Sequence, residues 1–255
     1  MASDKSWAKI CKDHKILKHD FKKSPFTLTA EDIKKSCQDF KATGEKEVRI
    51  LCKQDTREDR PRVFRDNGLF LLPIKNGVYA VVQGEGYVDI PEITGKVQTY
   101  SSKIGFTPDT TSVGNSEMQH LDYAYAASLI RTYMGDDSYI LTIRGRKYTP
   151  LFSFAAGKHK SKITAKSVQT EVDAGYEGKN RVLLVEAKNA ATTNVIIRQL
   201  YYPFRQWSAH TDKPVDLIFF EKRGEIFCIW RFVFDDVNDY NSVRMADSAR
   251  YKIRD

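Results

Sequence analysis

The chain has 255 residues, of which 41% are hydrophobic and 29% charged, a composition typical of a soluble globular protein with one large domain or two smaller ones. No apolar run approaches the roughly 20 residues that span a bilayer, and no apolar secretory core follows the N-terminus, so we expect a cytoplasmic protein with no membrane partner. The net charge of +8 favours polyanionic partners such as nucleic acids, because neutralising phosphates releases their counterions.

The first 60 residues are rich in lysine and are expected to begin with helices. Thr29 can cap a helix that starts near residue 30, and Asp32 stands three positions later, close to the arrangement of a capping box. Lys34 and Lys35 lie on the outer face of this helix and are candidate DNA contacts. Helices followed by strands are typical of a winged-helix-like DNA-binding unit, although an ordinary helical subdomain with solvated lysines would give the same pattern.

Strand-forming residues follow, first in a short run at residues 47–53 and then in a predicted β-hairpin within residues 69–90. Asn76-Gly77 separates the two halves of this hairpin and is a strong signal for a two-residue turn. Polar sequence follows the hairpin. We therefore place a domain boundary near residue 100, which gives a DNA-binding region over residues 1–100 and a second domain over residues 101–255.

The second domain is predicted to open with a helix over residues 115–134, capped by Asn115 or Ser116. Glu117 projects near the N-terminal end of this helix and is a candidate auxiliary acid. A β-rich run follows, and it ends in a basic cluster that suits a track for phosphates. The cluster consists of Arg144, Arg146 and Lys147.

A strand, a polar turn, a second strand and a helix are predicted within residues 168–207. Asp173 is expected to end the first strand. Glu186 and Lys188 are expected to end the second strand on one face, because side chains alternate along a strand. The pattern acid-x-Lys recurs along the chain, but only this copy closes a strongly apolar strand, where charged groups are costly unless they are paired or bind a metal.

Two nearly continuous apolar runs, at residues 215–222 and 225–234, are typical of strands at the centre of a covered sheet. The C-terminal residues 238–255 are predicted to form an edge strand or a packed tail. The four cysteines are scattered, which indicates neither a disulfide framework nor a zinc site.

The acids and the lysine of the strand pair suit hydrolysis of a phosphodiester, which is anionic and repels hydroxide. Asp173 and Glu186 are the candidate ligands of Mg²⁺, which binds through one or two carboxylates and acidifies water. Glu171, on the same face as Asp173, is the alternative first ligand. Lys188 would orient or help deprotonate the attacking water and offset charge in the transition state. A surface Glu–Lys pair that caps a strand is the structural alternative.

The spacing Asp-(12 residues)-Glu-Ala-Lys at Asp173, Glu186 and Lys188, between two helices, resembles the PD-(D/E)xK nuclease superfamily and, within it, type II restriction endonucleases. The resemblance covers roughly residues 112–234. It implies an α/β fold with a mixed central sheet flanked by helices, and it makes these three residues the catalytic trio. Val172 stands where the family usually has proline, so Glu171 and Asp173 remain alternatives. Family members often carry a glutamine on the following helix, where Gln199 stands.

The function implied by this resemblance is Mg²⁺-dependent cleavage of double-stranded DNA at a specific short sequence. We expect a homodimer, because two strands must be cut, and a cognate DNA methyltransferase in the same restriction–modification system. A repair or recombination nuclease of the same superfamily would instead act at ends, branches or mismatches. A non-catalytic DNA-binding regulator that uses residues 1–60 is the alternative outside the enzymes.

Overall fold

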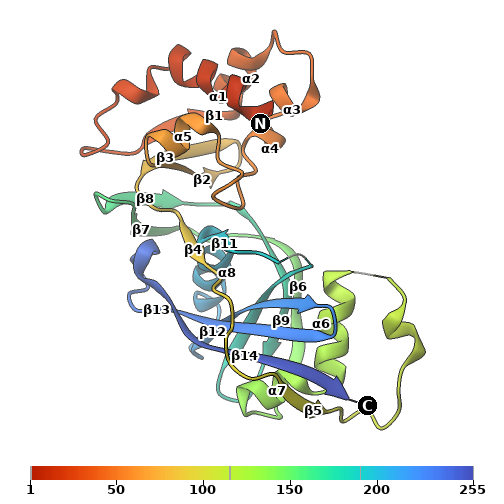
Figure 1. The fold of residues 1–255 in the computed structure, drawn as a ribbon. Helices are drawn as coiled ribbons and strands as arrows, with labels where there is room; N and C mark the ends of the chain where they lie inside the picture. The colour runs from red at the N-terminus through yellow and green to blue at the C-terminus, as the bar shows by residue number, and fades with distance from the viewer. Residues whose placement is uncertain (1, 115, 190, 255) are drawn as a thin grey trace.

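The computed structural model describes residues 2–114, 116–189 and 191–254, and it has an N-terminal part beside a larger C-terminal part (Figure 1). In the N-terminal part, helices cover a three-stranded antiparallel sheet of order β1-β3-β2. Its elements are α1 (Ala2–Asp13), the 3-10 helix η1 (Ile16–Lys18), β1 (Phe26–Thr29), α2 (Ala30–Cys37), α3 (Thr43–Lys46), α4 (Val48–Leu51), α5 (Arg62–Asp66), β2 (Leu69–Lys75) and β3 (Val78–Gln83).

A helix cap and a β-turn of the N-terminal part form as the sequence predicts. The Thr29 hydroxyl accepts a hydrogen bond from the Asp32 backbone N–H (3.1 Å), and the Asp32 carboxylate accepts one from the Thr29 N–H (2.8 Å). This reciprocal pair is a capping box and starts α2. Asn76-Gly77 forms the turn between β2 and β3, where Gly77 has a φ of 70°, a conformation that glycine adopts without strain.

The C-terminal part is built on a seven-stranded mixed sheet of order β5-β14-β13-β12-β10-β9-β6. The pairs β10–β12 and β14–β5 are parallel, and the other neighbours are antiparallel. Its strands are β5 (Gln98–Ser101), β6 (Ile140–Tyr148), β9 (Gln169–Glu177), β10 (Val182–Lys188), β12 (Val215–Arg223), β13 (Ile226–Phe234) and β14 (Val243–Arg254).

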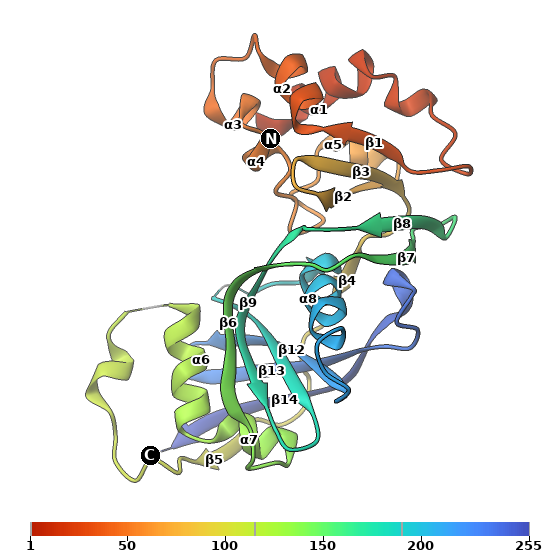
Figure 2. The same cartoon turned by 180° about the vertical axis from the view of Figure 1, so that it is seen from behind.

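Helices cover both faces of this sheet, as Figure 2 shows from behind. On one face, α6 (Glu117–Ala126) and α7 (Leu129–Met134) bury residues such as Leu121 and Ile130 against β9, β10 and β12. On the other face, α8 (Arg198–Ser208) buries Leu200 in a second cluster with Phe219 and Trp230. The expected mixed central sheet flanked by helices is therefore present.

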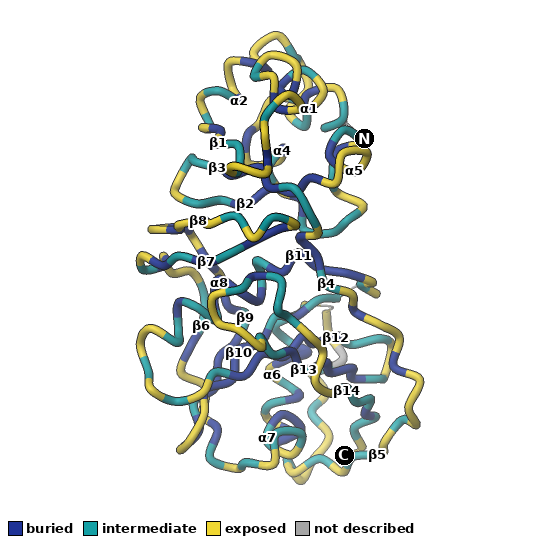
Figure 3. Tube along the Cα trace, turned by 90° about the vertical axis from the view of Figure 1, so that its left-hand side faces the viewer, coloured by how far each residue is buried: buried dark blue, intermediate teal, exposed yellow. Residues whose placement is uncertain are grey.

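Short strand pairs and an apolar core join the two parts. The hairpin β7 (Phe152–Ala156) and β8 (Ser161–Ala165) lies beside β2, and β4 (Tyr87–Asp89) pairs with β11 (Asn194–Ile196). The aromatic rings of Phe70, Phe154, Tyr201, Tyr202 and Tyr240 are buried in one cluster at this junction. In Figure 3 the buried trace accordingly continues from the sheet into the junction, whereas α2 buries one side, with Ile33, Ser36 and Cys37, and exposes the other.

One contact at the junction requires glycine. Lys158 at the β7–β8 turn donates its backbone N–H to the Gln83 carbonyl, 2.8 Å away. A Cβ at Gly84 would lie 2.4 Å from the Lys158 nitrogen, and a Cβ at Gly157 would lie 2.4 Å from the Gln83 oxygen. Only residues without a side chain allow the two backbones to approach this closely.

Several segments differ from the sequence-based expectation. The helix predicted over residues 115–134 is broken at Ser128, which has a left-handed φ of 66°. Ser116 is at the N-cap of α6 but makes no capping hydrogen bond through its side chain, and Asn115 lies outside the described residues. Residues 47–53 contain the helix α4 rather than a strand. The C-terminal strand β14 pairs with β5 only over residues 251–254, so the predicted edge strand is covered at its C-terminal end but has no strand partner on its outer side over residues 243–250 among the described residues.

The strands β4 and β5 both pair with C-terminal strands, although the sequence analysis places their residues before the boundary near residue 100. No helix within the described ranges has the length and apolar character needed to cross a membrane.

Candidate active site

Asp173 lies where β9 and β10 stop pairing. The antiparallel pairing of the two strands runs from Glu177 opposite Val182 to Ala174 opposite Val185. On its other side, β9 pairs with β6, and this second pairing continues beyond that point. The Asp173 carboxylate accepts a hydrogen bond from the Ala187 backbone N–H at 2.7 Å. The residue therefore occupies the middle of β9, not its end as predicted, but it does mark the end of the β9–β10 pairing.

Glu186 and Lys188 are at the end of β10, as predicted, and they share one face. The Lys188 ammonium donates a hydrogen bond to the Glu186 carboxylate. The Glu186 side chain is 11% exposed and the Lys188 side chain 27%, so the ion pair is mostly shielded from water. On its other side, β10 runs parallel to β12, with Glu186 opposite Phe219, which gives the pair a rigid apolar neighbour.

A cleft of about 840 Å³ opens between the two parts of the chain, and both parts line it. The C-terminal part contributes four acids, a lysine and an arginine to one side, and the N-terminal part contributes four basic and two acidic residues to the other. The charged residues that line the cleft are Lys34, Glu47, Arg49, Lys53, Asp55 and Lys75 from the N-terminal part, and Glu117, Glu171, Asp173, Glu186, Lys188 and Arg198 from the C-terminal part.

The two helices that flank the strand pair also bring their predicted residues to this cleft. Glu117 is the first residue of α6, and its carboxylate accepts a hydrogen bond from the Asn189 backbone N–H at 3.2 Å, directly after Lys188. Gln199 is the second residue of α8, and its buried Oε1 has no hydrogen-bond partner within the described ranges. An unsatisfied buried acceptor beside the carboxylates is costly in the free protein, so it suits a group that receives a ligand.

Glu171 and Asp173 are both at the cleft, but their surroundings differ. The Glu171 carboxylate forms an ion pair with Arg146 at 3.2 Å and is 55% exposed. Asp173 is half-buried, and the Lys188 charge acts on it. Arg146 already compensates the charge of Glu171, whereas Asp173 shares a single ammonium with Glu186.

The predicted DNA contacts separate in the structure. Lys34 lines the cleft, whereas the other four do not belong to the lining described for it. Arg144 pairs with Asp122 of α6, and Lys147 is exposed on the edge strand β6. Lys35 is exposed on α2, and Arg146 is held beside the cleft by Glu171.

The two acids of the site are costly to ionise because they are buried. Burial raises the pKa of Glu186 to about 7; the charge of Lys188 opposes this shift, and Asp173 adds a smaller contribution to it. Burial also raises the pKa of Asp173. Burial by itself lowers the pKa of Lys188, but the attraction of Glu186, Asp173 and Glu117 raises it overall, so this residue is a cation at neutral pH.

The donor set of the site fits Mg²⁺. Among the described residues, no three histidine, cysteine or acidic side chains form a ready-made metal cage. Asp173 and Glu186 nevertheless offer two hard carboxylates, and burial raises the pKa of both, so a cation at this position would stabilise their ionised forms. Mg²⁺ is commonly held by only one or two protein carboxylates, while water and phosphate oxygens complete its coordination.

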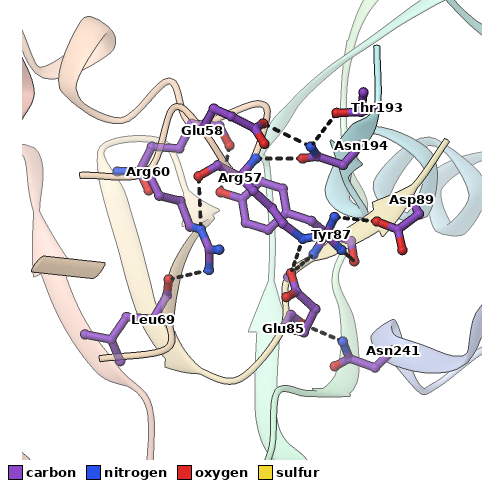
Figure 4. Close-up of polar contacts among 12 residues, drawn as sticks. Arg57, Glu58, Arg60, Leu69, Glu85, Tyr87, Asp89, Thr193, Asn194 and Asn241 are labelled. Carbon is purple, nitrogen blue, oxygen red and sulfur yellow. Dashed lines mark hydrogen bonds and ion pairs between the residues drawn. The ribbon is translucent and has the colours of Figure 1, made fainter. Parts of the chain in front are cut away.

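A polar network that the sequence analysis missed fixes the N-terminal part next to this site (Figure 4). The Asn194 side chain accepts a hydrogen bond from the Arg57 backbone N–H at 2.7 Å and donates one to Glu58 at 2.9 Å. The Arg57 guanidinium reaches Glu85 at 3.4 Å and also pairs with Asp89. From the sequence, residues 55–62 are expected only to form a charged loop, and no local pattern indicates their partners.

Comparison with known proteins gives two family matches. The description "Domain of unknown function (DUF6997)" matches residues 82–252, and "Domain of unknown function (DUF6996)" matches residues 4–81. No curated protein and no solved structure matches the chain. The two matches meet at the end of β3, directly before the glycine contact of the junction. The DUF6997 match covers more than half of the chain, so the chain belongs to the DUF6997 family.

Proposed function

We propose that this protein is a Mg²⁺-dependent endonuclease that hydrolyses double-stranded DNA at a specific short sequence, as type II restriction endonucleases do. The observation that carries the proposal is the grouping of Asp173, Glu186 and Lys188 on neighbouring strands, inside a cleft whose opposite wall has more basic than acidic residues. Two acids that burial makes costly to ionise and one shielded ammonium suit phosphodiester hydrolysis better than they suit a surface ion pair.

The arrangement of elements supports the same proposal. In the C-terminal part, α6 precedes strands β6, β9 and β10, and α8 and β12 follow, which is the order expected of a PD-(D/E)xK core. In the N-terminal part, helices alternate with β1 and precede the β2–β3 hairpin, which agrees with a winged-helix-like unit. We therefore propose a DNA-binding N-terminal domain that holds the duplex over a nuclease domain.

Asp173 and Glu186 would hold the metal ion in this enzyme. Bound Mg²⁺ would act as a Lewis acid that acidifies water and withdraws charge from the phosphate. The Ala187 N–H holds the Asp173 carboxylate in place, and β12 supports β10 behind Glu186, so the two acids are preorganised by backbone contacts. Of the two alternative first ligands, Asp173 is favoured because Arg146 already binds Glu171.

The other residues of the site orient and stabilise charge. The raised pKa of Lys188 keeps its ammonium charged, so the residue would offset the charge that develops on the phosphate and orient the attacking water, rather than remove a proton itself. Gln199 offers a free amide oxygen to water or substrate. Glu117 holds the backbone that follows Lys188 through its bond to Asn189.

Incubation of the purified protein with a large plasmid tests the proposal directly. Discrete fragments that require Mg²⁺ and disappear with EDTA are expected. A smear would point to a repair or recombination nuclease. Specific DNA binding without any cutting, under all metal conditions, would point to the non-catalytic regulator.

Two variants connect this activity to the site. Glu186→Gln and Lys188→Ala are expected to abolish cutting while DNA binding is largely retained, because the metal and the ammonium act in the chemical step. Glu177→Gln and Lys213→Ala are matched controls. Glu177 and Lys213 form an ion pair of 2.5 Å at the end of the β9–β10 pairing that is farther from Asp173, and neither residue lines the cleft. Cutting by Glu186→Gln at the rate of Glu177→Gln would contradict the assignment.

A duplex has two strands to cut, so we also propose that two copies of the chain act together as a homodimer. The mass of the protein in solution, measured with and without DNA by light scattering, tests this directly. A cognate methyltransferase that protects the same sequence completes the proposed system.

A further inference from the structure

Two cations from different parts of the chain approach one carboxylate in the cleft. The Arg198 guanidinium of α8 lies 3.5 Å from one oxygen of Asp55, and the Lys53 ammonium lies 3.9 Å from the other. Strong charge-assisted hydrogen bonds measure about 2.8 Å. Asp55 therefore balances only one of the two positive charges and holds neither of them tightly.

This group lies next to the proposed catalytic acids. Arg198 immediately precedes Gln199 at the start of α8, and both line the cleft together with Asp173 and Glu186. The Asp55 backbone oxygen accepts a hydrogen bond from the Ile196 N–H at 2.8 Å, which fixes the segment of Asp55 against the start of α8. The positions of the two cations therefore depend on both parts of the chain.

The N-terminal wall of the cleft carries further basic residues and one more acid, Glu47. Lys34, Arg49 and Lys75 come from α2, α4 and the end of β2, and all three are exposed to solvent. Several cations from separate elements match the repeated charges of a nucleic-acid backbone better than they match a single small anion. A phosphate that meets Arg198 would therefore belong to a strand that lies against this wall.

We infer that Arg198 and Lys53 form a subsite for a backbone phosphate of the bound DNA strand, adjacent to the phosphate that is cut, and that Asp55 occupies this subsite in the free protein. A phosphate offers two oxygens to the planar guanidinium, so it replaces a loosely held carboxylate with a stronger, two-pronged contact. The inference rests on the proposed function and adds a contact that the catalytic trio does not supply.

The exchange of Asp55 for a phosphate predicts opposite effects of two substitutions on affinity. Arg198→Ala removes a phosphate contact and is expected to weaken DNA binding about ten-fold, with the slope of log K against log salt reduced by about one. Asp55→Asn removes the competing charge and is expected to strengthen binding about three- to ten-fold. If Asp55 served only to join the two parts, its removal would not increase affinity.

The experiment measures binding of a short fluorescent DNA duplex by anisotropy, in EDTA and at several salt concentrations, so that metal and catalysis do not contribute. Arg244→Ala and Asp235→Asn are the matched controls. These two substitutions remove the same charges as Arg198→Ala and Asp55→Asn. Arg244 and Asp235 form an ion pair of 2.8 Å, each side chain is 58% exposed, and neither residue lines the cleft. Urea unfolding verifies the fold of each variant, and Arg198→Gln replaces Arg198→Ala if the latter is unfolded.

The outcomes separate this inference from the proposed function. Weaker binding by the Arg198 variant than by Arg244→Ala, together with tighter binding by Asp55→Asn than by Asp235→Asn, supports the subsite. Equal affinities within each matched pair overturn it, even if the wild-type protein binds and cuts DNA. If wild-type protein binds no duplex at any salt concentration, both the subsite and the proposed nuclease function are overturned.

Discussion

The Asp173 carboxylate accepts a hydrogen bond from the Ala187 backbone N–H at 2.7 Å, and this contact links β9 to β10 just beyond the point where their backbone pairing ends. The same side chain is thus both a structural link between two strands and a proposed metal ligand. These two roles make different demands on it, since the link needs an oxygen acceptor whereas the metal needs a negative charge.

Substitutions at Asp173 are expected to separate the two roles. Asp173→Asn keeps an oxygen that can accept the Ala187 N–H but loses the charge, so it should stop DNA cutting without a loss of stability. Asp173→Ala also leaves the N–H without its partner and should lower the free energy of unfolding by about 1 kcal/mol or more. Urea unfolding and plasmid cleavage measure the two effects. Full activity of the asparagine variant would remove Asp173 from the metal site.

Glu171→Gln is expected to retain most of the cleavage activity, unlike Asp173→Asn. Glu171 is 55% exposed and paired with Arg146, so its charge is already compensated without a metal. Cleavage rates of the two variants under identical Mg²⁺ concentrations make the comparison. If the Glu171 variant is inactive and the Asp173 variant cuts DNA, the first ligand is Glu171.

Added Mg²⁺ is expected to raise the melting temperature of the wild-type protein, because a ligand that binds only the folded state stabilises it. The ion should stabilise the ionised forms of Glu186 and Asp173, whose pKa values are raised chiefly by burial. Calorimetric melting with Mg²⁺ and with EDTA measures this shift. The Glu186→Gln variant should show a smaller shift than the Glu177→Gln control. Identical shifts in both would place the ion elsewhere.

The capping box of α2 should make a pH-dependent contribution to stability. Hydrogen bonds from the Thr29 hydroxyl and backbone lower the pKa of Asp32 below its ordinary value of 3.8. The contribution is therefore present above that value and is lost as the pH falls through the lower pKa of the folded state. Wild type and Asp32→Asn should differ in urea unfolding at neutral pH and converge in strong acid. A difference that persists in strong acid would mean that the charge of Asp32 is unimportant.

Asn194→Ala should destabilise the protein more than a typical surface substitution does. It removes the acceptor of the Arg57 N–H and the donor to Glu58 at a residue that is 3% exposed. Loss of a buried hydrogen-bond partner costs about 1–3 kcal/mol. Urea unfolding measures the change, and Asn67→Ala is the matched control, since the exposed Asn67 follows α5 and its side chain donates a local hydrogen bond to the Val63 carbonyl of that helix. A change no larger than that of the control would show that the network does not hold the junction.

Sequence patterns predicted the features that depend only on residues a few positions apart. Glu186 and Lys188 share a face because residues two apart in a strand always do, and the apolar run before them fixed the strand. Thr29 and Asp32 are three residues apart, and their capping box needs nothing outside one helical turn.

Tertiary contacts decided the rest. Val48 and Ile50 favour a strand by composition, but a helix forms here because Val48 and Leu51 are buried against the helices around Trp7, whose indole N–H donates to the Leu51 carbonyl. Asp173 was expected at a strand end, yet β9 continues because β6 pairs with it from the other side. Arg198 and Asp55 are 143 positions apart in the chain, a separation at which sequence spacing carries no signal.

The close contact of Gly84 with Gly157 limits how freely this protein can be reassembled from modules. Two separate family descriptions meet at this point, which suggests units that recombination could exchange. A new N-terminal unit would dock on the C-terminal part only if the last residues of its hairpin matched the backbone of the β7–β8 turn without any side chain between them. For the proposed nuclease, changes in DNA specificity are therefore expected to arise by substitutions within the existing unit more readily than by its replacement.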